Sequence, residues 1–77
     1  MKHFRYKVED DEIKGLIGEV ETIPPGYIEM NNSMGADRIY YKITGGKITE
    51  AIGEAIHEPA AHRRVEEFIS SFNVNLF

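Results

Sequence analysis

Residues 38–46 read RIYYKITGG, and their pattern indicates a sheet-containing fold. Apolar and polar side chains alternate along it, which is typical of a β-strand with one buried face. The alternation separates two sets of side chains: Ile39, Tyr41 and Ile43 on one face, and Arg38, Tyr40 and Lys42 on the other. The Gly45-Gly46 pair then tolerates the positive φ angles of a tight hairpin turn. A β-hairpin is therefore expected here, with its second strand after the turn.

Residues 47–57 follow the turn, and their pattern is mixed. Isoleucines recur every four residues, at Ile48, Ile52 and Ile56, which favours a helix. The preceding Gly-Gly pair and Gly53 favour a hairpin strand with a bulge instead. We prefer the strand and keep the helix as the alternative.

Two further strands are expected in the first half of the chain. Residues 3–8 read HFRYKV and alternate without a break, so they predict a half-buried strand. Residues 24–26 read PPG and end whatever precedes them. Residues 27–30 then predict a short strand, and the turn-forming residues 31–37 predict an exposed loop.

Residues 11–22 allow two interpretations. Apolar side chains at Ile13, Leu16, Ile17 and Val20 have the spacing of one stripe on a helix. Two glycines, at positions 15 and 18, disfavour a helix because each costs about 1 kcal/mol relative to alanine. A short helix is our preferred prediction, and a strand over residues 16–23 is the alternative.

The C-terminal part predicts one helix. Pro59 suits a first helical turn, and an apolar stripe follows at Val65, Phe68, Ile69 and Phe72. The chain therefore predicts a single α+β domain over residues 1–77. We expect an antiparallel sheet of three to five strands, with the C-terminal helix and a second short helix packed on one face.

The composition limits the classes of protein. A chain of 77 residues buries a small core, so a homodimer would add stability. There is no cysteine, and the alternating first eight residues do not form a signal peptide, so we expect a cytoplasmic protein. The sequence also lacks the run of about 20 apolar residues that spans a bilayer, so no membrane partner is expected.

The net charge of −4 is unevenly distributed along the chain. Eight acids lie in residues 9–37 against Lys14 alone: Glu9, Asp10, Asp11, Glu12, Glu19, Glu21, Glu29 and Asp37. Such a surface would steer association with a basic protein. We therefore expect a small, non-catalytic protein-binding module that modulates or inhibits a larger partner, in a stronger form by mimicking nucleic acid. In size and charge, though in no motif, the chain looks like the small acidic adaptors and inhibitors of bacteria and their phages.

An alternative hypothesis uses the polar faces of two strands. Basic residues around an exposed aromatic ring suit single-stranded nucleic acid, which needs charge for phosphate and a ring for stacking. The candidates are Arg5, Lys7, Arg38, Tyr40 and Lys42. The net acidity of the chain argues against this hypothesis, because affinity for nucleic acid depends on neutralised phosphates.

Catalytic motifs are weak. Residues 57–62 read HEPAAH, which resembles a zinc-protease helix only superficially, because that motif needs histidines four apart. His57 and His62 are five apart, with Pro59 between them. We expect no enzyme activity, metal or cofactor. A third hypothesis remains an enzyme whose site forms at an oligomer interface near His57 or His62.

Overall fold

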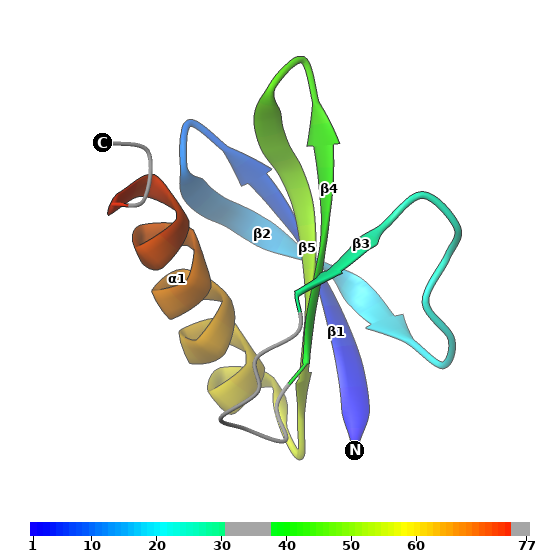
Figure 1. The fold of residues 1–77 in the computed structure, drawn as a ribbon. Coiled ribbons are helices and arrows are strands. Elements are labelled where there is room, and N and C mark those ends of the chain that lie inside the picture. Colours follow the sequence, from blue (N-terminus) through cyan, green and yellow to red (C-terminus); the bar gives the residue numbers. More distant parts are fainter. Residues whose placement is uncertain (31–37, 75–77) are drawn as a thin grey trace.

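The computed structural model describes residues 1–30 and 38–74, which form a β-sheet and one helix (Figure 1). The elements are β1 (Lys2–Glu9), β2 (Glu12–Val20), β3 (Ile28–Met30), β4 (Ile39–Thr44), β5 (Lys47–Ala55) and α1 (Glu58–Val74). Every strand pairing is antiparallel. The α+β class, the antiparallel sheet and the C-terminal helix are thus confirmed.

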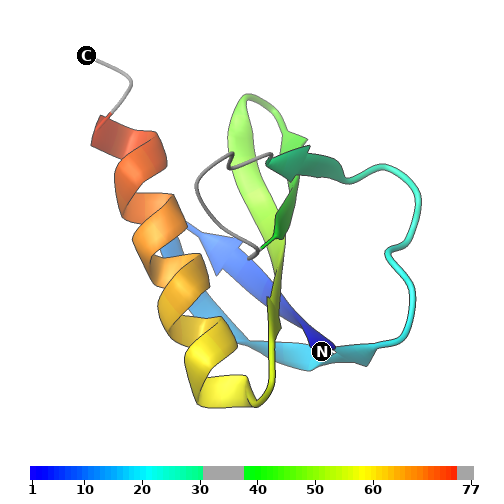
Figure 2. The ribbon, with the colours of Figure 1, turned by 60° about the horizontal axis from the view of Figure 1, so that its bottom comes forward.

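The strands lie in the order β2-β1-β5-β4-β3, so β2 and β3 form the two edges of the sheet. Helix α1 covers one face, which we call the helix face (Figure 1). The segment 21–27 leads from the β2 edge to the β3 edge and lies on the side of the sheet away from α1 (Figure 2). We call this side the far face.

The second short helix predicted over residues 11–22 is wrong, because this segment forms the nine-residue strand β2. Two bulges explain the three-residue spacing of Ile13 and Leu16, whereas Val20, the last residue of the predicted stripe, pairs with His3 and lies on the opposite face. Ile13 pairs with Val8, Leu16 with Tyr6 and Glu19 with Phe4, while Lys14 and Ile17 lack partners in β1. Each bulge inserts one residue, so side chains on the helix face recur every three positions instead of every two.

Residues 47–55 form the strand that we preferred over a helix. The irregularity in its pairing with β4 lies at Thr49, since Lys42 pairs with Glu50 and Ile43 with Ile48. Gly53 has a different role. A Cβ atom there would lie 2.9 Å from Cγ2 of Val65 and 3.0 Å from the carbonyl oxygen of Ala61, so this glycine lets α1 approach β5.

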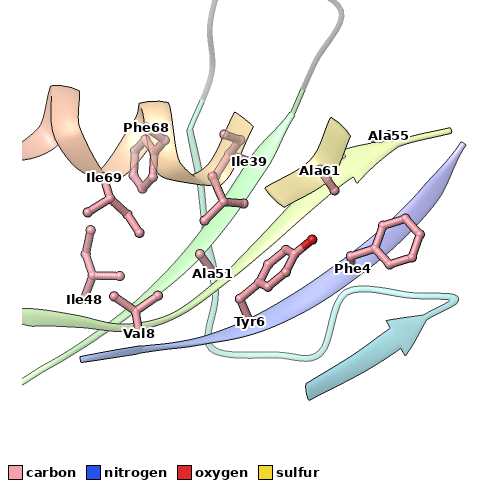
Figure 3. Close-up of a cluster of buried hydrophobic side chains, with 11 residues drawn as sticks. Phe4, Tyr6, Val8, Ile39, Ile48, Ala51, Ala55, Ala61, Phe68 and Ile69 are labelled. Carbon is pink, nitrogen blue, oxygen red and sulfur yellow. The ribbon is translucent and has the colours of Figure 1, made fainter. Parts of the chain in front are cut away.

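The hydrophobic core lies between the helix face and α1 (Figure 3). Tyr6 on β1 is fully buried and extends toward the start of the helix, where its hydroxyl donates a 2.6 Å hydrogen bond to Oε2 of Glu58. Val65, Phe68 and Ile69 supply the apolar stripe of α1, as the sequence predicts. No helix in the described part of the chain is both long and apolar enough to cross a bilayer.

Candidate functional site

Four consecutive acids lie at the turn between β1 and β2, and we call Glu9, Asp10, Asp11 and Glu12 the acidic tip. Glu9 pairs directly with Glu12, which leaves a two-residue turn. Asp10 and Asp11 have φ angles of 52° and 64°, the left-handed region that such hairpin turns need. All four residues are exposed, so their carboxylates concentrate negative charge at one end of the hairpin.

Only the outer two acids of the tip are paired within the described residues. Lys7 Nζ lies 3.9 Å from Glu9 Oε2, and Lys14 Nζ lies 3.2 Å from Glu12 Oε2. Asp10 and Asp11 form no ion pair with the described part of the chain. Their charge is therefore available to a partner.

A hollow of about 250 Å³ adjoins the acidic tip, and we call it the acidic hollow. It lies between the β1–β2 hairpin and α1, and its lining residues are Asp11, Glu12, Ile13, Glu66, Ile69 and Ser70. Three carboxylates next to two isoleucines match a lysine or arginine side chain, whose stem is apolar and whose head is cationic.

The remaining predicted acids lie elsewhere. Glu19 and Glu21 lie at the opposite end of β2 from the tip. Glu29 lies on β3, at the other edge of the sheet, with its Oε1 3.4 Å from Nη1 of Arg38. Asp37 lies outside the described residues. The eight acids are therefore concentrated in one half of the chain, but those that the structure describes are divided among separate places in the fold and do not form one negative side.

Between the two acidic ends of β2 lies an apolar stretch. Leu16 and Ile17 are 50% and 49% exposed, although both are large apolar side chains. Leu16 faces the same side as its partner Tyr6, but α1 does not cover it. Gly15 and Gly18 flank the pair, and a Cβ atom at either glycine would meet no atom within 4 Å.

The far face carries a hydrogen-bonded cluster centred on Glu50. Arg5 Nε donates a 2.6 Å hydrogen bond to Glu50 Oε1, and the Tyr27 hydroxyl donates to the same oxygen. Arg5 lowers the pKa of Glu50 from its ordinary value, with a further contribution from Tyr27. Burial, and then the Glu50 carboxylate, raise the pKa of Tyr27 to about 12. Glu50 is thus held ionised and Tyr27 neutral at pH 7.

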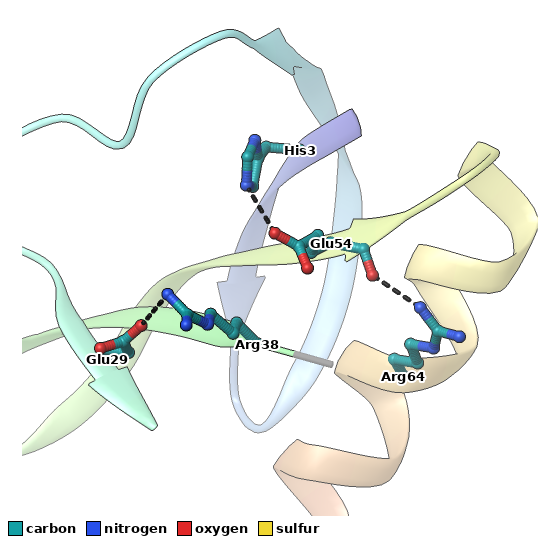
Figure 4. A network of polar contacts seen from close by, with 5 residues as sticks. All are labelled: His3, Glu29, Arg38, Glu54 and Arg64. Carbon is teal, nitrogen blue, oxygen red and sulfur yellow. Dashed lines mark hydrogen bonds and ion pairs between the residues drawn. The ribbon is translucent and has the colours of Figure 1, made fainter. Parts of the chain in front are cut away.

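A second group of polar contacts surrounds Glu54, as Figure 4 shows. His3 Nε2 lies 3.1 Å from Glu54 Oε2, and Arg64 Nη1 donates a 2.7 Å hydrogen bond to the carbonyl oxygen of Glu54. The His3 ring also lies 6.2 Å from that of Tyr40, edge to face. These contacts connect β1, β4, β5 and α1.

Strands β1 and β4 flank β5, so the structure gathers the candidate nucleic-acid-binding residues near one another. These residues are Arg5, Lys7, Arg38, Tyr40 and Lys42. Lys7 and Lys42 both pair in register with Glu50, and Glu54 lies next to Arg38 along the sheet. The far face therefore alternates positive and negative charge and forms no continuous basic strip.

The two histidines have structural roles at the start of α1. His57 Nδ1 accepts a 3.4 Å hydrogen bond from the amide of Ala60, in the manner of a helix cap. His62 lies between Glu58 and Glu66, 3.6 Å from a carboxylate oxygen of each. In the described residues, no group of three or more potential ligands could hold a metal ion.

A second hollow, of about 310 Å³, includes His57 but not His62. Arginines and a glutamate on α1 complete its lining, with Pro59 and Ala60. The two histidines are thus separated, and the chain alone does not assemble them into a shared site.

Comparisons with known proteins give no relative: no family model, curated protein or solved structure matches the chain. The geometry is therefore the basis for any functional argument. The sequence predicted a role for all eight acids, of which four form the acidic tip; it assigned Leu16 and Ile17 to a helical stripe and did not single out Tyr27. The one signal for the exposed apolar stretch was the pair of glycines around it, which disfavour a helix.

Proposed function

We propose that this protein is a small, non-catalytic protein-binding module that contacts a basic surface of a larger partner. The acidic tip and the adjoining acidic hollow form the contact, and occupation of the partner's basic surface modulates or inhibits that partner. The observation that carries the proposal is the hollow, where Asp11, Glu12 and Glu66 surround a space also lined by Ile13 and Ile69. A basic side chain would bury its stem and neutralise carboxylates there.

The conformation of the turn supports a role for its charge. Aspartate is less favourable than glycine in the left-handed region, and Asp10 and Asp11 both adopt it. Four neighbouring carboxylates also repel one another. Asp-Gly or Asn-Gly would form the same turn at lower cost. Charge retained at a cost to folding is typical of a surface that serves binding.

The partner is defined by chemistry. It presents lysine or arginine side chains on a surface or a segment that also carries apolar groups. Proteins that bind nucleic acid have such surfaces, and a partner of that kind would be inhibited by competition. The lack of cysteine fits a reducing compartment, and we propose that this interaction takes place in the cytoplasm.

Affinity capture with matched charge variants tests the proposal. The tip variant D10N/D11N and the control variant E29Q/E67Q each remove two exposed carboxylates, from different places in the fold. Each variant is immobilised and exposed to an extract of the source cell, and captured proteins are identified by mass spectrometry. The unmodified chain and the control should capture the same basic protein, and the tip variant should lose it.

The stability of each variant is measured by thermal unfolding. The proposal requires that the tip variant remain folded while it loses its partner. Capture of the same partner in equal amount by the tip variant would contradict the proposal. Equal loss from both variants would show that net charge alone attracts the partner, and this too would contradict a contact at the tip.

A further inference from the structure

We infer that the partner contributes an extended segment that pairs with the free edge of β2, so that it extends the sheet by one strand. This inference rests on the proposed function and specifies its mode of binding. The segment would be basic, with apolar residues between its charges, and it would continue from the acidic hollow along β2.

The β2 edge is the longer of the two sheet edges. It has nine residues, whereas β3 at the opposite edge has three. Within the described part of the chain, β2 pairs with β1 alone. An edge strand directs alternate backbone N–H and C=O groups away from the sheet, where they offer hydrogen bonds to another strand.

The composition of β2 is unexplained by its own fold. Neither Gly15 nor Gly18 has a positive φ angle, and neither is needed for close packing, since a Cβ atom would meet nothing within 4 Å. Glycine weakens a strand, and it often marks a place where another backbone approaches closely. Between these glycines, Leu16 and Ile17 are half exposed and would be covered by an added strand.

The charges of β2 decide between possible occupants. Glu12 precedes the apolar stretch and Glu19 and Glu21 follow it, against Lys14 alone, and the acidic tip adds three more carboxylates at one end. A second copy of this chain would bring the same negative edge and a net charge of −4 against it. A segment with lysine or arginine on both sides of apolar residues complements the edge at both ends.

The two bulges in β2 fit a selective edge. Bulges and charged residues are devices that keep edge strands from pairing indiscriminately. Lys14 and Ile17 lack partners in β1, so the twist changes at both positions and limits how far a regular ladder can extend. The edge would therefore favour a segment whose charges compensate for imperfect backbone pairing.

Two blocked peptides provide the test. In the first, lysine and valine alternate; in the second, the central valines are replaced by proline, which keeps the charge but removes the backbone donors of a strand. The first peptide should bind at low salt at least about ten-fold more tightly than the second. Hydrogen exchange of the complex should show slower exchange at the amides of β2, with those of β3 unchanged as the internal control. Equal affinity for the two peptides, no binding of either, or protection confined to the tip would overturn the inference.

Two variants locate the contact. L16N/I17N replaces the exposed apolar pair of β2, and I56N replaces an isoleucine that is 75% exposed just after β5, away from this edge. L16N/I17N should weaken binding of the lysine–valine peptide about ten-fold, whereas I56N should leave it unchanged. Equal binding by all three proteins would overturn the inference.

The tests distinguish failure of the proposed function from failure of the inference about strand pairing. If D10N/D11N loses the captured partner while L16N/I17N retains it, the acidic tip binds without strand addition, and only the inference is overturned. Sedimentation of the unmodified chain tests the other occupant. A dimer that L16N/I17N converts to monomer would show that a second copy covers β2, and this also overturns the inference.

Discussion

Glu50 accepts hydrogen bonds from Arg5 and Tyr27 at one oxygen, and this contact joins β1, β5 and the segment that covers the far face. Two of the basic candidates on the far face, Arg5 and Lys42, already have partners within the fold. Arg5 is engaged by a carboxylate, and Lys42 lies 5.9 Å from the Tyr27 ring centroid and pairs in register with Glu50. Arg5 and Lys42 therefore help to stabilise the fold on the far face.

The pKa shifts of the Glu50 cluster predict how stability depends on pH. The folded state raises the pKa of Tyr27 from 10.0 to about 12, so its stabilising contribution is present below pH 10.0 and is lost as the pH rises toward 12. The folded state lowers the pKa of Glu50 from 4.5, so its contribution is present above that value and is lost as the pH falls through the lower folded pKa. Urea unfolding at about pH 9 and about pH 11 measures this effect. Between these two pH values, the free energy of unfolding should fall less for Tyr27→Phe than for the unmodified protein. Identical losses in the two proteins would contradict the assignment.

We expect the Asp11 side chain to favour binding of the partner but to lower the stability of the fold. Asp11→Gly removes a side chain from the left-handed region and one charge from a repelling set, so the free energy of unfolding should rise by roughly 0.5–1 kcal/mol. Capture of the basic partner should fall at the same time. Asp11→Asn is the control for charge, because asparagine also tolerates this backbone conformation. A turn variant that is less stable than the original would refute the argument from backbone strain.

Strand β2 shows how a bulged strand can have the residue spacing of a helix. Its bulges at Lys14 and Ile17 place Ile13, Leu16 and Glu19 on one face with a spacing of three, which is close to the period of a helix. Strand β5 shows a related effect, because Ile48 and Ile52 are four residues apart and both buried, yet only Ile48 belongs to the core under α1. Thr49 is an extra residue in β5 that has no partner in β4. It therefore places Ile48 and Ile52 on opposite faces of the sheet.

The glycines of β2 and β5 should respond in opposite directions to the same substitution. Gly15→Ala should raise the free energy of unfolding by about 0.4–1 kcal/mol, because the added methyl group meets open space. Gly53→Ala should lower it by about 1–3 kcal/mol, because its Cβ atom would press on Val65 and Ala61. Denaturant unfolding of both variants measures this difference. A stabilised Gly53→Ala protein would contradict the close approach of α1 to β5.

The stability of the molecule depends on the coverage of both faces of its five-stranded sheet. Helix α1 packs on one face, and the segment with Tyr27 lies over the other, where Ile52 is fully buried. A domain of this size has a small margin of stability, so each large side chain of the core contributes a sizeable share. The separate acidic places follow from the same architecture, since one sheet holds β2 and β3 at opposite edges.

Loss of one core aromatic should show this dependence. Phe68→Ala removes a ring that packs 5.1 Å from Tyr41 and lies in the main core, so it should cost about 3–5 kcal/mol of stability. Much of the population should then be unfolded near 37 °C by circular dichroism. Ile56→Ala is the matched control. Because Ile56 is 75% exposed, this variant should unfold at the same temperature as the unmodified protein. Equal thermal midpoints for the two variants would contradict the assigned core.

Local sequence patterns were sufficient to predict the strands at 3–8 and 38–44, the hairpin turn at Gly45-Gly46 and the C-terminal helix. Alternation and helical periodicity report which side chains share a face, and these patterns are local. Contacts between distant segments set the order of the strands, the bulges in β2 and the placement of Glu50 beside Arg5 and Tyr27. They also separated the acidic tip from Glu29, because pairing between distant strands depends on the packing of the whole chain and leaves no periodic signal in any one segment.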